Sequence, residues 1–393
     1  MFIPRPILPQ LEEELQYPEA TVITGMRQVG KTTLLEHLFE EVKSTNKARL
    51  DLENPLYRKI FEEENYDAIW NNLKPFGVTS GEKAYIFLDE VQHLTSIASV
   101  VKYLQDHWKV KFVLTGSSSY YLKNLFPESL SGRKLIFELF PLTFAEFLVF
   151  KGVVREVLAT FSQKSKGKNN ISYQKLLPYY LEYLEFGGFP KVVLEENIER
   201  KKRLLTDLFT SYYENDVKSL ADFKDFSKLR DLILLLIPRV GSRIEVAKLS
   251  QSLGVSRGTV YSYLSFLEKT YFIFLLPKFS GSIDRQAAGT KKLFLCDGGM
   301  ANTLGKLSDG QLFEQSVFQN LHQNHNLYFY NKEGANEIDF IVDGQIALEA
   351  KASVSKRDIE HLKRRSTSCD LDEYYVVTKE YSGEKEVILA IDL

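Results

Sequence analysis

Two glycines, a lysine and a threonine near the start of the chain have the types and the spacing that bind phosphate. The stretch ATVITGMRQVGKTT, residues 20–33, places Gly25 four residues before Gly30, Lys31 and Thr32. Glycines let the backbone wrap closely around an anion, while loop N–H groups and a helix N-terminus supply the positive ends of dipoles. Lys31 would reach the β- and γ-phosphates and Thr32 would ligate Mg²⁺. The pattern predicts a P-loop that binds a nucleotide.

The residues on either side give this loop the context that it needs. Ala20–Thr24 is a β-branched run typical of a buried strand, and an apolar helical pattern follows from Leu34. A glycine-containing turn that carries a lysine by chance is the alternative, and both flanks argue against it. Arg27 is a candidate for contact with the terminal phosphate. We expect the nucleotide to contact Gly25, Arg27, Gln28, Val29, Gly30, Lys31, Thr32 and Thr33.

Two neighbouring acids, Asp89 and Glu90, form the second chemical signal. They end the stretch 84–90, AYIFLDE, whose apolar part predicts a buried strand. In a P-loop protein, an acid at the carboxyl end of a core strand is placed to hold the Mg²⁺ shell. An acid directly after it is placed to orient the attacking water. We therefore predict that Asp89 shares the magnesium with Thr32, and that Glu90 is catalytic.

Ser117 and Arg133 are further candidates for contact with the γ-phosphate. Ser117 belongs to a polar cluster that follows an apolar run at 112–114, although a serine-rich turn without a catalytic part fits equally well. Arg133 directly precedes an apolar run at 135–139. It could act as an arginine finger in its own subunit or in a neighbour, and a surface salt bridge is the alternative.

A parallel sheet is the element that would position these residues. Strand-like runs at 20–24, 48–52, 85–88, 112–114 and 135–139 alternate with helical patterns, which predicts a three-layer α/β domain. The polar stretch 163–171, QKSKGKNNI, is the strongest linker signal. We expect a P-loop domain at 1–160, a linker and helical region at 161–235, a winged helix-turn-helix at 236–280 and a last domain at 281–393.

The third of these parts has the pattern of a helix-turn-helix. One helix ends at Gly254, Ser256 caps a second that runs to about Lys269, and 271–276 indicates a strand that would complete a winged helix. The second helix offers few lysine or arginine side chains for contacts with DNA phosphates. A packing or substrate-guiding role is therefore the alternative to DNA binding. In a DNA-binding module, the groove would be faced by Arg257, Thr259, Tyr261 and Ser262.

Acids and a lysine gather again in the last third, on a predicted hairpin of strands 337–342 and 346–351. A two-residue turn would leave Asp339 and Glu349 on opposite faces, whereas a three-residue loop at 342–344, with Gly344 left-handed, sets Asp339 on the face of Glu349 and Lys351. We predict the odd-length loop. Such a face could hold a divalent metal and position water to attack a phosphodiester. A salt-bridged surface hairpin is the alternative.

Composition sets broad limits. The 393 residues carry a formal net charge of −2, with 44% hydrophobic and 26% charged residues, as in an ordinary globular protein of several domains. This charge argues against a general nucleic-acid-coating protein. Two cysteines fit a reducing compartment and make no metal cluster. The chain shows neither an export signal nor a membrane-length apolar run, so we expect a cytoplasmic protein without a membrane partner.

Several motifs together resemble the predicted AAA+-superfamily ATPases of archaea and bacteria. These are TGMRQVGKTTLL, IFLDEVQHL, VLTGSSS, LSGR, FELFPLTFAEF and GGFP. The segments KKLFLCDGGMANTL, LFEQSVFQNL and NEIDFIV…ALEAK resemble the C-terminal domain of unknown function fused to those ATPases. The resemblance implies an AAA+-like P-loop core, a helical region, a winged helix and a restriction-endonuclease-like last domain. It also implies ATP rather than GTP, and adds Glu314 to Asp339, Glu349 and Lys351 as a nuclease-like metal site.

These observations favour an ATP- and Mg²⁺-dependent ATPase with C-terminal output domains acting on DNA. Its sharper form adds metal-dependent DNA cleavage at Asp339, Glu349 and Lys351. The alternative is a nucleotide-gated switch that binds DNA or a protein partner and hydrolyses ATP slowly. Neither the choice of partner nor the oligomeric state follows from the sequence.

Overall fold

The computed structural model describes residues 2–116, 132–155, 158–217, 226–280, 286, 289–332 and 336–393. These residues form two compact units. The first contains the chain up to Phe140 together with Lys269–Tyr271, and the second contains most of the remainder. The four-part division expected from the sequence is finer than this grouping and stays a prediction. No helix in the described ranges is long and apolar enough to span a membrane.

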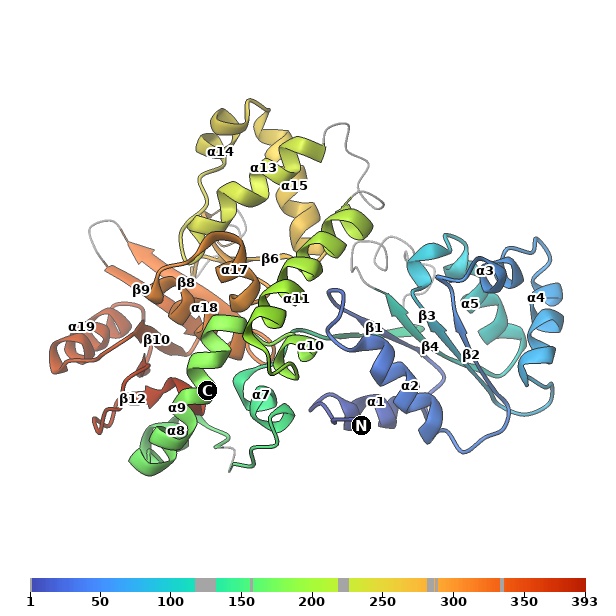
Figure 1. Ribbon diagram of the computed structural model, residues 1–393, viewed down its shortest axis with the longest axis horizontal. Coiled ribbons are helices and arrows are strands. Elements are labelled where there is room, and N and C mark those ends of the chain that lie inside the picture. The colour runs from blue at the N-terminus through green and yellow to red at the C-terminus, as the bar shows by residue number, and fades with distance from the viewer. Residues whose placement is uncertain are drawn as a thin grey trace. The chain divides into compact units, whose positions relative to one another are not determined.

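The first unit is built on a five-stranded parallel sheet with the order β2-β3-β4-β1-β5 (Figure 1). All five predicted strands are present, so the expected parallel α/β fold is confirmed. Their bounds are β1 Ala20–Thr24, β2 Lys47–Asp51, β3 Ala84–Asp89, β4 Val110–Gly116 and β5 Lys134–Glu138. Every residue of β1 and β4 is buried, because helices cover both faces of the sheet, and this explains their unbroken apolar runs.

Helices make the two outer layers of this unit. Ala84, Ile86 and Leu88 of β3 share a core with α3, α4 and α5. The intervening Phe87 faces the other way and packs its ring against Phe39 of α2. The bounds are α1 Leu8–Glu14, α2 Lys31–Glu41, α3 Pro55–Phe61, α4 Tyr66–Leu73, α5 Ile97–His107, and the short 3₁₀ turns η1 Lys74–Phe76 and η2 Val91–His93.

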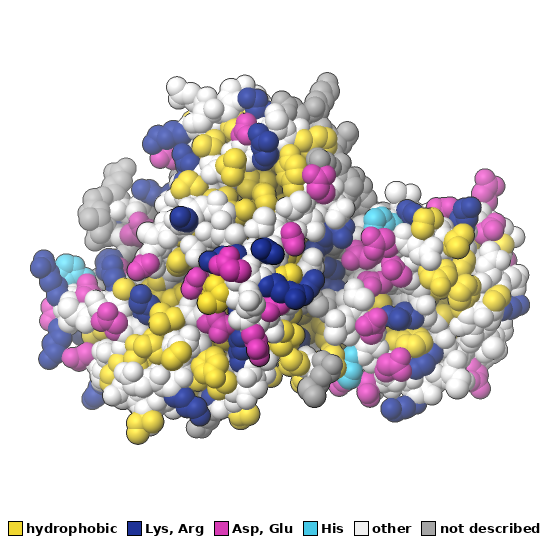
Figure 2. Space-filling view, in the orientation of Figure 1, with side chains coloured by type: hydrophobic (Ala, Val, Ile, Leu, Met, Phe, Trp, Pro, Cys, Tyr) yellow, Lys and Arg dark blue, Asp and Glu magenta, His cyan; other side chains and the backbone are white. Residues whose placement is uncertain are grey.

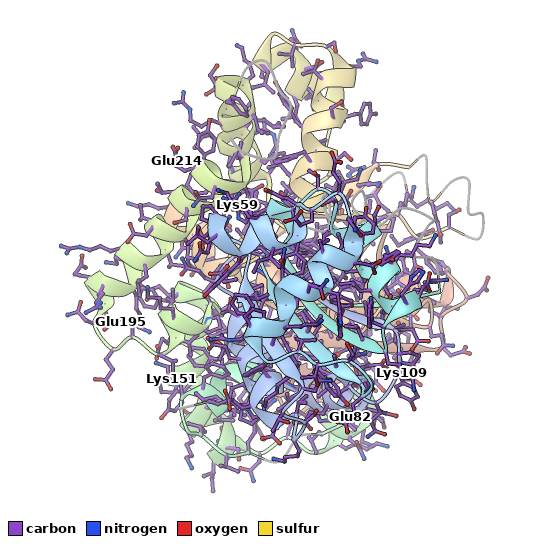
Figure 3. The ribbon with its side chains drawn as sticks, turned by 90° about the vertical axis from the view of Figure 1, so that its right-hand side faces the viewer. Lys59, Glu82, Lys109, Lys151, Glu195 and Glu214 are labelled. Carbon is purple, nitrogen blue, oxygen red and sulfur yellow. The ribbon has the colours of Figure 1, made fainter. Side chains whose placement is uncertain are left out.

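The strands all run in one direction, which defines two ends of the sheet. Glu82, two residues before β3, and Lys109, directly before β4, lie at one end of the unit, whereas Lys59 of α3 lies at the other (Figure 3). The P-loop follows the carboxyl end of β1, as ligand sites in parallel sheets do.

The second unit begins with helices. These are α7 Phe144–Phe150, α8 Phe161–Lys166, α9 Asn170–Phe186, α10 Pro190–Val193, α11 Ile198–Ser211, a π-helical turn η4 Tyr212–Val217, α13 Phe226–Leu236 and η5 Ile237–Arg239. The linker expected at 163–171 is wrong, because α8 and the start of α9 occupy most of it. Thr160 and Gln163 form a capping box that starts α8, and Ser165 and Lys168 donate hydrogen bonds to carbonyls of residues 384–387.

The predicted helix-turn-helix elements are present in this unit. α14 Val246–Leu253 ends at Gly254, which is left-handed with φ 66°, and the Ser256 hydroxyl accepts the Thr259 N–H at the start of α15 Arg257–Lys269. β6 Ile273–Pro277 then pairs antiparallel with β7 Lys291–Leu295. A winged helix remains a prediction for these elements.

The last part of the unit is a five-stranded mixed sheet with the order β12-β11-β10-β9-β8. α18 packs on β10 and shares a core with the sheet, while α19 packs on β9, β10 and β11. The bounds are α17 Gly298–Gly305, α18 Asp309–Leu321, β8 Leu327–Lys332, β9 Asn336–Val342, β10 Ile346–Lys351, α19 Lys356–Thr367, β11 Glu373–Thr378, β12 Val387–Leu389 and η6 Ala390–Asp392.

The β9–β10 hairpin has the expected odd-length loop, but one residue further along the chain. Asp343 and Gly344 both have positive φ, 51° and 72°, and the Gln345 N–H donates to the Val342 carbonyl at 3.0 Å. Gln345 adds a third residue to the two-residue turn of Asp343 and Gly344, so that Val342 pairs with Ile346. The loop is therefore 343–345 rather than 342–344, and continuation of this register sets Asp339 opposite Glu349.

Candidate functional site

The P-loop joins β1 to α2 through two glycines with positive φ, Gly25 at 147° and Gly30 at 104°. A Cβ atom on Gly25 would lie 2.0 Å from the carbonyl oxygen of Leu139, so no side chain fits there. Gly30 has open space around it and caps α2 without a side-chain hydrogen bond. The first N–H groups of α2 therefore face the loop as phosphate donors would.

Cations hold the loop from two sides. The ammonium of Lys31 donates to the carbonyls of Gly25 and Met26, both at 2.9 Å, and the residue is buried. Arg5, from the segment before α1, donates to the carbonyl of Val29 at 3.3 Å and to that of Phe140 at 3.1 Å. Arg5 is a functional candidate that the sequence analysis missed, since a lone arginine outside a motif carries no local signal.

Thr32 and Asp89, the two residues predicted to share a magnesium ion, lie close together, and that role stays a prediction. The Asp89 carboxylate accepts a hydrogen bond from the Thr115 hydroxyl. Burial raises the pKa of Asp89 above its ordinary value, and the Thr115 and Thr32 hydroxyls beside the carboxylate oppose the rise. The cost of burying this carboxyl group would fall if a cation lay beside it. A hydroxyl and a carboxylate are suitable oxygen ligands for Mg²⁺, so the residues fit the ion.

Glu90 has an unusual backbone. Its φ of 53° and ψ of 48° are left-handed, which costs a non-glycine residue roughly 1–3 kcal/mol. Its N–H donates to Asp89 and to Thr115, both at 3.1 Å, and its carboxylate accepts a hydrogen bond from the Gln92 amide. Thr115, at the end of β4, thus contacts both acids, and the sequence analysis did not single it out.

The remaining predicted loop residues surround the same turn. Arg27 is half-buried, Gln28 is exposed with φ 61°, Val29 is buried and Thr33 is exposed. Ser117 lies outside the described residues.

Arg133 lies at the other end of the sheet from the P-loop. Its carbonyl accepts the N–H of Ala20, the first residue of β1, whereas the loop follows Thr24 at the strand's far end. Its guanidinium pairs with Asp106, and both side chains are 40% exposed. The predicted γ-phosphate contact within the same subunit does not fit this position, because each strand residue adds about 3.3 Å. The surface salt bridge is what the structure contains.

A second set of charged groups lies in the second unit, and we call it the Lys292 cluster. It comprises Lys292 of β7, Glu314 of α18, and Glu337 and Asp339 of β9. The Lys292 ammonium lies 2.5 Å from Glu314 Oε1, 3.2 Å from Glu337 Oε1 and 3.3 Å from Asp339 Oδ1. Burial alone would lower the pKa of Lys292, but Asp339, Glu314 and Glu337 outweigh it and raise the pKa. Lys292 was not predicted as a site residue.

Glu349 and Lys351 adjoin this cluster. Glu349 is buried, and its carboxylate lies 3.2 Å from the Lys351 ammonium and 3.1 Å from the Arg365 guanidinium of α19. Burial, and then the nearby Asp339, raise the pKa of Glu349. Lys351 and Arg365 also line a polar cavity of about 500 Å³ with His361 and Arg364. Lysine and arginine side chains gather over α19 in Figure 2.

The metal role of Glu314, Asp339, Glu349 and Lys351 stays a prediction. The structure brings all four residues together, but Lys292 lies between Glu314 and Asp339. Among the described residues, no group of three or more histidine, cysteine or acidic side chains is arranged to hold a metal ion.

Comparison with known proteins agrees with the geometry of the first site. Residues 17–148 match the family model of an AAA domain. Residues 17–148 form an AAA-type P-loop domain. The match covers β1 to β5, the P-loop, Asp89 of β3 and the adjoining Glu90. Two further models, both of domains of unknown function, match residues 177–311 and 309–391.

Two uncharacterized relatives are similar in sequence along nearly the whole chain. An uncharacterized protein of Methanocaldococcus jannaschii is 28% identical over 94% of this chain and 84% of its own length. One of Haemophilus influenzae is 26% identical over 97% of this chain and 96% of its own. A solved Walker-type ATPase of Pyrococcus abyssi is 14% identical, covers 77% of this chain and 96% of its own, and has a TM-score of 0.49. That last likeness is too distant to carry an argument.

Proposed function

We propose that the AAA-type domain hydrolyses ATP with Mg²⁺. The closeness of Thr32 to Asp89 carries this proposal, because it brings the start of α2 and the end of β3 together beside the loop. When bound, Mg-ATP supplies the phosphoanhydride bond and a metal that neutralises charge on its oxygens. Thr32 and Asp89 would hold the metal, and the backbone around Gly30 would hold the phosphates.

Lys31 and Glu90 each exchange one partner for another in this scheme. The Lys31 ammonium leaves the carbonyls of Gly25 and Met26, which it contacts at 2.9 Å, and turns toward the phosphates. The Glu90 carboxylate leaves the Gln92 amide and accepts a proton of the attacking water.

A nucleotide-gated switch is a second form of the function. In this form, an output partner raises turnover by stabilising the exchanged contacts of Lys31 and Glu90, whose partners named above lie within the chain. We propose DNA as that partner, acting through α14, α15 and the β6–β7 hairpin as a winged helix. Arg257, Tyr261 and Ser262 are exposed along α15, as base-reading side chains would be. A protein partner is the competing choice.

Phosphate release from Mg-ATP, with and without duplex DNA, tests both parts. Lys31→Ala and Glu90→Gln should each lower turnover at least 100-fold, while Lys43→Ala, an 88% exposed control just after α2, should not. Turnover that is unchanged in Glu90→Gln would refute the assignment of Glu90. DNA that neither binds in a salt-dependent way nor changes turnover would point to a protein partner.

A further inference from the structure

We propose that Lys292 is the resident cation of the C-terminal carboxylate cluster, and that this site takes no divalent metal. The proposal concerns the second unit alone and does not depend on ATP hydrolysis. It departs from the prediction of a nuclease-like metal site at Glu314, Asp339, Glu349 and Lys351, because Lys292, which is not one of these residues, lies between Glu314 and Asp339.

The contacts of Lys292 match the donors of an ammonium group. An ammonium has three N–H donors and no acceptor, and here three carboxylates approach it at 2.5, 3.2 and 3.3 Å. The side chain is only 2% exposed, so no water competes for these donors. A divalent metal would need oxygens of Glu314 and Asp339 at about 2.0–2.6 Å from one point. Lys292 is in contact with both.

The remaining oxygens of the site also have partners. Asp339 Oδ2 accepts the Ala350 N–H at 3.0 Å, which fixes the carboxylate across the hairpin. Glu314 Oε1 and Glu349 Oε2 make no hydrogen bond of regular geometry, yet each lies beside a cation, Lys292 and Arg365 respectively. The two orphaned oxygens are thus explained by ion pairs rather than by a missing metal.

Charge balance supports the same assignment. Glu314, Glu337, Asp339 and Glu349 face Lys292, Lys351 and Arg365, so the acids of this region are nearly matched by the chain's own cations. A metal bound in addition would leave an excess of positive charge in a buried place, which is costly. Without Lys292, the same carboxylates would attract a cation from solution.

Binding of Mn²⁺ to the nucleotide-free full chain, followed by electron paramagnetic resonance, tests the proposal. The wild-type chain and Asp339→Asn should bind the same number of ions, since ions held elsewhere, such as near Asp89, are common to both. Loss of one tight Mn²⁺ site on going from wild type to Asp339→Asn would overturn the proposal.

Removal of the lysine charge should open the site. Lys292→Met is expected to gain one Mn²⁺ site, with at least tenfold tighter binding than wild type there, and Asp339→Asn added to it should abolish the gain. Lys291→Met, a half-buried neighbour on the same strand, should gain none. A folded Lys292→Met without a new site would refute the claim that the ammonium keeps metal out. If Lys292→Met does not fold by circular dichroism, Lys292→Gln replaces it, and the wild-type comparison decides independently.

Discussion

The carboxylate of Asp297 accepts a hydrogen bond from the N–H of Gly188 at 2.7 Å, although the two residues lie 109 positions apart. Asp297 is fully buried and also accepts the N–H of Met300 at 2.9 Å and the amide of Gln319 at 3.1 Å. A Cβ atom on Gly299 would lie 2.1 Å from the backbone of Phe186, so the two chain segments touch directly. The GGFP segment, residues 187–190, and the CDGGM segment, residues 296–300, therefore pack directly against each other and are held by the Asp297 carboxylate.

Removal of this carboxylate should destabilise the second unit. Asp297→Ala leaves buried donors without an acceptor and should lower the free energy of unfolding by about 3 kcal/mol, whereas Asp297→Asn keeps one acceptor oxygen and should lower it less. Both tryptophans, Trp70 and Trp108, belong to the first unit and stack at 4.6 Å. Their fluorescence is thus an internal control, while circular dichroism follows the whole chain in urea. Equal losses in the two variants would refute this account.

Arg5 should act as a positioning residue for the P-loop. Arg5→Ala removes the donors to the carbonyls of Val29 and Phe140, so the loop loses its bracing and nucleotide affinity should fall about tenfold. Arg5→Lys should restore part of it, since an ammonium can donate to one carbonyl. Titration with a fluorescent ATP analogue measures this, and Lys59→Ala, exposed on α3, is the matched control. Unchanged affinity in Arg5→Ala would show that the loop holds its shape alone.

Arg133→Ala should leave nucleotide affinity within a factor of two of wild type. The residue lies at the amino end of β5 and pairs with Asp106 on the surface, where an ion pair is worth little. Titration with the fluorescent ATP analogue measures this affinity. The protein is kept dilute, so that Arg133 of one copy does not contact nucleotide bound to another. A tenfold loss would restore the predicted contact in the same subunit, and a loss that appears only at high protein concentration would indicate action in trans.

His322 should make stability fall in mild acid. Its Nε2 has almost no solvent exposure, and burial lowers the pKa to about 4. The unfolded chain gains a proton as pH drops below about 6.5 while the folded chain does not, so stability present above that pH is lost on acidification. From pH 7 to 5 the loss is roughly 2 kcal/mol. His322→Phe, which keeps the stacking on Phe318 at 4.6 Å, should lose about 2 kcal/mol less over this range in urea titrations. Identical pH slopes would contradict the assignment.

The sequence was sufficient for the features that follow from local pattern. The P-loop and the strands depend on short motifs and on the rule that ligands bind at the carboxyl ends of parallel strands. The same rule argues against a contact of Arg133 with the nucleotide of its own subunit, because Arg133 precedes β5 and so lies at the amino end of the sheet. Lys292 could not be found in this way, because its partners come from α18 and β9, far along the chain. Gln345 was missed because a tight turn and an added bulge share one sequence pattern.

The register of the β9–β10 hairpin has an evolutionary consequence. Continuation of this register sets Asp339 opposite Glu349, an arrangement of like charges that is unfavourable unless cations accompany it. Lys292 and Arg365 supply those cations from two other elements. A lineage that loses either base leaves the neighbouring acids without the cation that the chain itself supplied. These four positions are therefore expected to change together among descendants of a common ancestor, as a single inherited unit.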